Sequence, residues 1–109
     1  MEATSLRFAA AARVLGDAAR AAGMTVPSFR SPPRVVGRSR TIRRRADGSA
    51  TVAIVLRDRP WPGVLADMIE GIVTGNAQRG AEADRLRDTL WSALMAAGEV
   101  TPTDQARAA

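Results

Sequence analysis

The most regular hydrophobic pattern of the chain lies in the stretch 62–75. Its apolar side chains recur with the 3.6-residue period of an α-helix, and acidic and hydroxyl side chains take the opposite side. The apolar positions are Val64, Leu65, Met68, Ile69, Ile72 and Val73. Pro62 suits the first turn of a helix, and Gly75 with Asn76 suits its end. The pattern predicts an amphipathic core helix over 62–75.

Two runs of strand character flank the dipeptide Asp47-Gly48, which is typical of hairpin turns because both residues tolerate a positive φ. They predict strands over 38–46 and 49–57. The second run is rich in β-branched residues and is apolar in both alternating sets. We therefore expect this strand to be covered on both faces.

The register of this hairpin is open between two alternatives. A two-residue loop would pair Arg44 with Thr51, whereas a three-residue loop with a glycine bulge would pair Ile42 with Val52. A slip by one residue exchanges the two faces of a strand. We prefer the three-residue loop because it places one apolar side chain opposite another.

Alanine-rich stretches at both ends predict two further helices, over 6–22 and 81–97. Residues 1–4 are expected to fray. Between the first helix and the hairpin, residues 24–37 contain three prolines and are expected to form an extended connection.

These elements predict a single α+β domain over 5–98, with the order αββαα and an arginine-rich hairpin packed by three helices. Residues 99–109 are expected to form a disordered tail. A lone two-stranded hairpin is marginal in water, so we also expect the sheet to be completed across a homodimer.

Composition narrows the class of protein. The 109 residues carry a net charge of +5, and all 16 basic residues are arginine. The chain has no cysteine, which excludes disulfides and thiolate metal sites. It also has no apolar run of the length of a membrane span. We expect a cytoplasmic protein that does not enter a membrane.

Catalytic residue types are scarce, since the chain lacks His, Cys, Lys and Tyr. Asp58, Asp67 and Glu70 could in principle hold a proton or Mg²⁺, but the last two lie on the polar face of the predicted core helix, where solvated carboxylates are expected. No phosphate-binding glycine motif is present. We expect a non-enzymatic protein without cofactor or metal.

The arginine-rich segment is the main functional signal, because no acidic residue occurs between Ala18 and Ala46. The candidate nucleic-acid-binding residues are Arg38, Arg40, Arg43, Arg44 and Arg45. Strand alternation sends Arg43 and Arg45 to one face and the other three to the opposite face, so at least one row must be exposed. An arginine-bearing ribbon suits phosphates and DNA grooves.

Two functions follow from this segment. One is phosphate-directed binding of nucleic acid, preferably DNA, because the ribbon lacks aromatic residues that would stack on unpaired bases. The alternative is a protein-interaction module that binds an acidic protein surface.

The stretches Phe29–Arg34 and Ala66–Val73 resemble those of small uncharacterised proteins of GC-rich actinobacteria. The resemblance covers most of the chain and implies a bacterial cytoplasmic protein. No established activity accompanies it.

Overall fold

The computed structural model describes residues 2–32, 40–56, 59–76 and 80–103, with side chains from Leu6 onward. The element order within these residues is α-β-β-β-α-α. The elements are α1 (Glu2–Ala21), β1 (Ser28–Arg30), β2 (Arg40–Arg44), β3 (Ala50–Ile54), α2 (Trp61–Asn76) and α3 (Ala81–Ala96). The predicted α+β class is confirmed, with one strand more than the sequence indicated.

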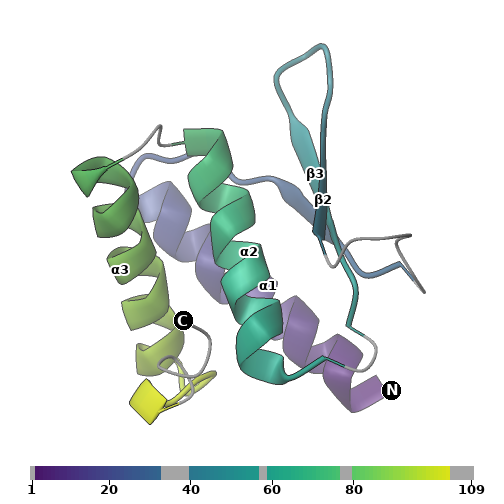
Figure 1. Cartoon of the computed structure of the whole chain (residues 1–109), viewed down its shortest axis with the longest axis vertical. Coiled ribbons are helices and arrows are strands. Elements are labelled where there is room, and N and C mark those ends of the chain that lie inside the picture. The colour runs from purple at the N-terminus through teal and green to yellow at the C-terminus, as the bar shows by residue number, and fades with distance from the viewer. Residues whose placement is uncertain (1, 33–39, 57–58, 77–79, 104–109) are drawn as a thin grey trace.

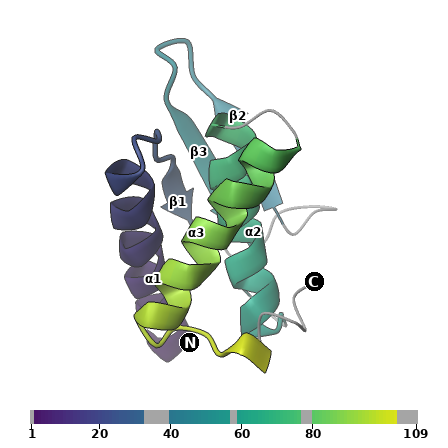
Figure 2. The same cartoon turned by 90° about the vertical axis from the view of Figure 1, so that its left-hand side faces the viewer.

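The elements form three layers (Figures 1 and 2). The sheet is the first layer, α1 and α2 are the second, and α3 packs on the far side of these two helices. Helix α2 makes the main helical contact with the central strand, β3. The second face of the sheet therefore carries none of the described helices. The expected cover of the second hairpin strand on both sides is thus met on one face only by the described helices.

The hairpin has the preferred register, with Ile42 opposite Val52. The backbone N–H of Arg45 donates to the carbonyl of Ser49 at 2.9 Å, which leaves a three-residue loop. Gly48 closes this loop with φ 89°, a conformation that a side chain would make costly. The strands are shorter than the predicted 38–46 and 49–57, of which positions 38, 39 and 57 lie outside the described residues.

The strand β1 was not predicted and comes from the proline-containing connection. It pairs in parallel with β3, placing Phe29 opposite Val52, and the strand order is β1-β3-β2. A third strand thus comes from the same chain, so β3 needs no neighbour from another subunit. The pairing of hairpins across a homodimer stays a prediction.

The core lies between the sheet and the helices. All six apolar residues predicted for α2 are at most 2% exposed, and Val52 and Ile54 of β3 are fully buried. Burying six such side chains contributes on the order of 10 kcal/mol, an upper bound because denatured chains already hide some of this surface. The apolar face predicted for α2 therefore packs against β3.

Both ends of the fold extend beyond the predicted limits. Helix α1 begins at Glu2 rather than at residue 6. After α3, the indole N–H of Trp61 donates to the carbonyl of Glu99 at 3.1 Å, and Val100 is only 6% exposed. The domain thus continues two residues past the predicted boundary at residue 98, while residues 104–109 lie outside the described part.

Gly71 gives the most direct test of the packing between α2 and β3. A Cβ at Gly71 would lie 3.0 Å from both methyl groups of Val52, which is buried under the helix. We expect Gly71→Ala to lower the free energy of unfolding by about 1–3 kcal/mol through overpacking, despite the better helix propensity of alanine. Chemical denaturation measures this change.

Gly75→Ala is the matched control on the same helix. A Cβ there meets no atom within 4 Å, so this variant should be neutral or slightly stabilising. Equal stability of the two variants would show that α2 does not approach β3 this closely.

Candidate functional site

The alternation of β2 divides its arginines into two rows. Arg40 is opposite Ile54 and Arg44 is opposite Ala50, on the sheet face that meets α2. Arg43 is opposite Thr51, on the open face. The predicted division of the arginines between faces is confirmed for the described residues, and Arg38 lies outside them. The five predicted site residues therefore do not form one surface.

Arg40 belongs to an ion-pair cluster centred on Asp67 of α2. Its Nη1 lies 3.4 Å from Asp67 Oδ1, and Nη1 of Arg59 lies 2.6 Å from the buried Oδ2. The second contact is an ion pair without aligned hydrogen-bond geometry, and Arg59 donates its hydrogen bonds to the carbonyls of Val55 and Gly63. Asp67 is 17% exposed, so the expectation of a solvated carboxylate is wrong.

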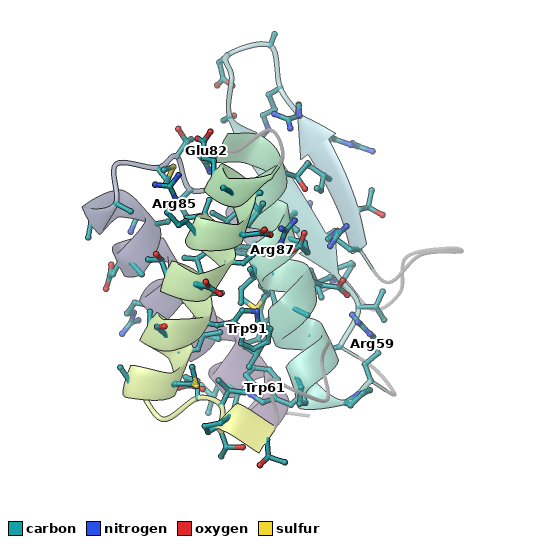
Figure 3. All side chains as sticks on the ribbon, turned by 60° about the vertical axis from the view of Figure 1, so that its left-hand side comes forward. Arg59, Trp61, Glu82, Arg85, Arg87 and Trp91 are labelled. Atoms are coloured by element: carbon teal, nitrogen blue, oxygen red, sulfur yellow. The ribbon has the colours of Figure 1, made fainter. Side chains whose placement is uncertain are left out.

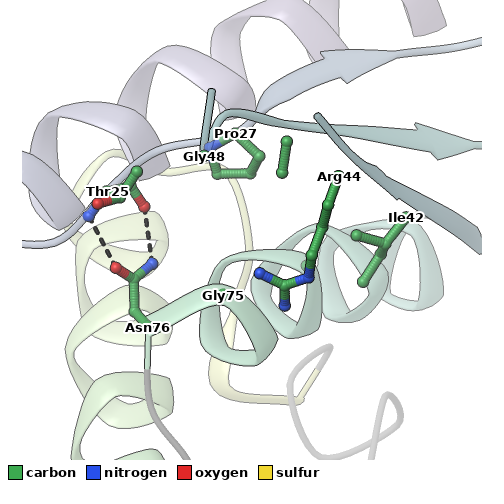
Figure 4. Close-up of a pocket in the computed structure, with 9 residues that line it drawn as sticks. Thr25, Pro27, Ile42, Arg44, Gly48, Gly75 and Asn76 are labelled. Carbon is green, nitrogen blue, oxygen red and sulfur yellow. Dashed lines mark hydrogen bonds between the residues drawn. The ribbon is translucent and has the colours of Figure 1, made fainter. Parts of the chain in front are cut away.

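Arg44 is also occupied within the molecule. Its Nη2 donates to the carbonyl oxygen of Thr74 at 3.2 Å, in the last turn of α2, where a cation is favourable to the helix dipole. Asn76 closes the same helix end by exchanging two hydrogen bonds with the backbone of Thr25, at 2.8 and 2.7 Å (Figure 4). The cleft between these groups encloses about 30 Å³, which is space for water rather than for a larger ligand.

Glu70, the other carboxylate on the predicted polar face of α2, also has a partner. Nε and Nη2 of Arg87 on α3 donate to its two oxygens at 2.7 and 2.9 Å, in a bidentate arrangement that joins α2 to α3 (Figure 3 labels Arg87). The hydrogen bond to Glu70 raises the pKa of the Arg87 guanidinium. No group of three potential metal-ligating side chains occurs in the described part of the chain. The helix carboxylates thus have structural partners.

The open face of the sheet gathers the arginines that have no such partner. Arg30 at the end of β1, Arg43 on β2 and Arg45 at the start of the hairpin loop are all exposed. They line an open groove of about 440 Å³ with Pro32, Thr41, Thr51 and Ala53. Among the described residues, no hydrogen bond or ion pair engages these three guanidinium groups, and the groove lining contains no acid. We call this surface the arginine groove.

Arg30 is the member of the groove that the sequence prediction missed. The sequence predicts an extended connection around Arg30, and only the pairing of Arg30 with Ala53 through β1 places it on the sheet. One feature of the sequence could have indicated this strand. The run 49–57 is apolar in both alternating sets, which suits a central strand with a neighbouring strand on each side.

Aromatic side chains are absent from the arginine groove, because each of the four in the chain is placed elsewhere. Phe8 and Phe29 pack edge to face at 6.4 Å between α1 and β1. Trp91 is 9% exposed in the core, and the ring of Trp61 lies 4.3 Å from the guanidinium carbon of Arg7 (Figure 3 labels both tryptophans). The groove thus offers charge, hydroxyl groups and small side chains.

Comparison with protein-family profiles, curated proteins and solved structures finds no match to this chain. Within the described residues, no helix has the length and apolar character needed to cross a membrane. What the arginine groove binds must be inferred from its own geometry and charge.

Asp67→Asn tests the ion-pair cluster. The substitution removes the charge that faces Arg40 and Arg59, so we expect a loss of about 1–2 kcal/mol in the free energy of unfolding, moderated because both arginines still reach water. Thermal or urea unfolding measures it.

Asp17→Asn is the control, because Asp17 pairs with Arg20 on α1 with side chains 73% and 65% exposed. Its loss should cost less than about 0.5 kcal/mol. A neutral Asp67→Asn would mean that the cluster adds no stability.

The hairpin loop gives a pH-dependent test. Ser49 donates from its hydroxyl and its backbone N–H to Asp47 Oδ1 at 2.6 and 2.9 Å, and the hydroxyl bond is the main cause that lowers the pKa of Asp47 below its ordinary 3.8. The lowered pKa means that this stabilisation is present above pH 3.8 and is lost as pH falls through the folded-state pKa.

We expect Ser49→Ala to move the pKa of Asp47 back towards 3.8, measured by NMR titration of its carboxyl group. Ser92→Ala, at an exposed position of α3, should leave that pKa unchanged. An unchanged Asp47 titration in Ser49→Ala would refute the loop geometry.

Proposed function

We propose that the arginine groove binds nucleic acid through its phosphate groups. The supporting observation is the gathering of Arg30, Arg43 and Arg45 from two strands and a turn, unpaired among the described residues, around an acid-free floor. Guanidinium groups bind phosphates through paired, charge-assisted hydrogen bonds. Thr41 and Thr51 add hydroxyl donors on the same floor.

The distribution of charge over the rest of the molecule favours binding of a polyanion at the open sheet face. The acidic residues Glu82, Asp84 and Asp88 are exposed on α3, in the layer farthest from the sheet (Figure 3 shows Glu82). The nearest acid to the groove in sequence, Asp47, is held by Ser49 at the hairpin loop. Helix α3 also carries Arg85 and Arg87, and Arg87 pairs with Asp84, so its excess of acid is small. The open sheet face has arginines and no acid in its groove, and a polyanion is therefore favoured there.

The inward arginines have a different role in this proposal. Arg40 and Arg44 hold β2 on α2 through Asp67 and the carbonyl of Thr74. Their loss should weaken binding through the position of the strand, and Arg30 replaces them in the proposed contact set.

A salt titration tests the proposal. Binding by counterion release loses about 0.9 log units of affinity per log unit of salt for each phosphate neutralised. We expect random-sequence duplex DNA to bind the intact protein, and Arg43→Ala with Arg45→Ala to reduce the slope by about two. Fluorescence anisotropy between about 50 and about 200 mM salt covers the useful range.

The matched control is Arg13→Ala with Arg85→Ala, which removes the same charge from exposed positions on α1 and α3. This variant should keep the slope of the intact protein. An equal reduction of the salt slope in the two double variants would show that binding depends on net charge rather than on the groove. No binding by folded protein at low salt would overturn the proposal and favour an acidic protein partner.

A further inference from the structure

We infer that the ligand of the arginine groove is double-helical DNA in the B form, held by its two backbones across one groove of the helix. This inference rests on the proposed function and adds the class of nucleic acid. It follows from three features: the absence of aromatic side chains from the groove, the small residues of its floor, and the placement of arginines on both edge strands.

Recognition of unpaired bases depends on stacking against aromatic side chains. Phe8, Phe29, Trp61 and Trp91 are the only aromatic residues in the chain, and none lines the arginine groove. Phe29 is on β1 but pairs with Val52, which places it on the helix side of the sheet. The groove can therefore hold phosphates but has no aromatic surface on which to stack a splayed base.

The floor of the groove allows a double helix to approach. It consists of Thr41 on β2 and Thr51 and Ala53 on β3, which are small and half-buried, with Thr41 level with Ala53 across the sheet. No large side chain on this floor separates the sheet from a ligand. The charged side chains instead stand at the two edges.

The arginines flank the floor from opposite edges of the sheet. Arg30 is level with Ala53 on the β1 side, and Arg43 is level with Thr51 on the β2 side. Two strand spacings and an offset of two residues place their Cα atoms about 12 Å apart in a regular sheet. Arg45 follows on the β2 side, about 7 Å beyond Arg43 along the strand direction.

This spacing fits two separate backbones. Arg43 and Arg45 can contact phosphates of one DNA strand while Arg30 contacts the other, with the floor facing the groove between them. The major groove of B-form DNA is about 12 Å wide and admits a β-ribbon, whereas the major groove of A-form RNA is deep and narrow. Contacts of this kind position the protein without reading the base sequence.

A competition experiment with the full chain distinguishes the forms of nucleic acid. Three labelled probes of equal length and matched sequence are titrated by anisotropy near 0.1 M salt: duplex DNA, single-stranded DNA and duplex RNA. We expect duplex DNA to bind about tenfold or more tightly than either of the others, because only it engages both edges. Equal or tighter binding of either competitor overturns this inference but leaves phosphate binding intact. Failure of all three probes overturns the proposed function itself.

Arg30→Ala then tests the two-edge arrangement. Loss of one phosphate contact should weaken duplex DNA binding by about tenfold near 0.1 M salt, while single-stranded DNA, held by the other edge, should change much less. Arg13→Ala, which removes one exposed charge from α1, should leave the ratio of the two affinities unchanged. An Arg30→Ala variant that weakens both probes equally would contradict contacts from two edges. Circular dichroism confirms that each variant is folded.

Discussion

The close approach of α2 to β3 is the constraint on which the arrangement of this molecule depends. Gly71 brings the helix against Val52, and the hairpin register places Ile42 beside that contact. Because one face of β3 must be buried there, strand alternation sends Thr51 and Ala53 outward. The composition of the open face follows from a packing contact on the opposite side of the sheet.

The same contact explains why neighbouring arginines have different roles. Arg44 faces the last turn of α2, while Arg43, one residue earlier, faces outward with no described partner. Asp67 forms ion pairs with Arg40 and Arg59. These contacts join β2 and the segment before α2 to the helix. An arginine-rich strand can thus both secure a fold and present charge to a ligand.

The sequence predicted the elements whose signals are local. The stripe of α2 spans several turns, and the hairpin register followed from matching Ile42 with Val52, so both were confirmed. The strand β1 has three residues and one apolar side chain, a pattern too short to show a period. Because β1 was not predicted, Arg30 was not included among the expected site residues.

The roles of the carboxylates depend on partners distant in sequence. Asp67 meets Arg40 from 27 residues earlier, and Glu70 meets Arg87 from 17 residues later. Helical periodicity correctly placed both acids outside the apolar stripe, but it cannot show which polar residue of another element will face them. Such pairs are fixed by the packing of layers, which a one-dimensional pattern does not contain.

The packing of α1 against α3 has a consequence for the order of assembly. The β2–β3 hairpin closes a short loop and can form early, whereas the packing of α1 on α3 must wait for the last of the described helices. During synthesis, Phe8 can meet Phe29 early, but the side of α1 that packs on α3 stays uncovered until α3 has been made. The alanine-rich composition of α1 limits the apolar surface that is exposed in that interval.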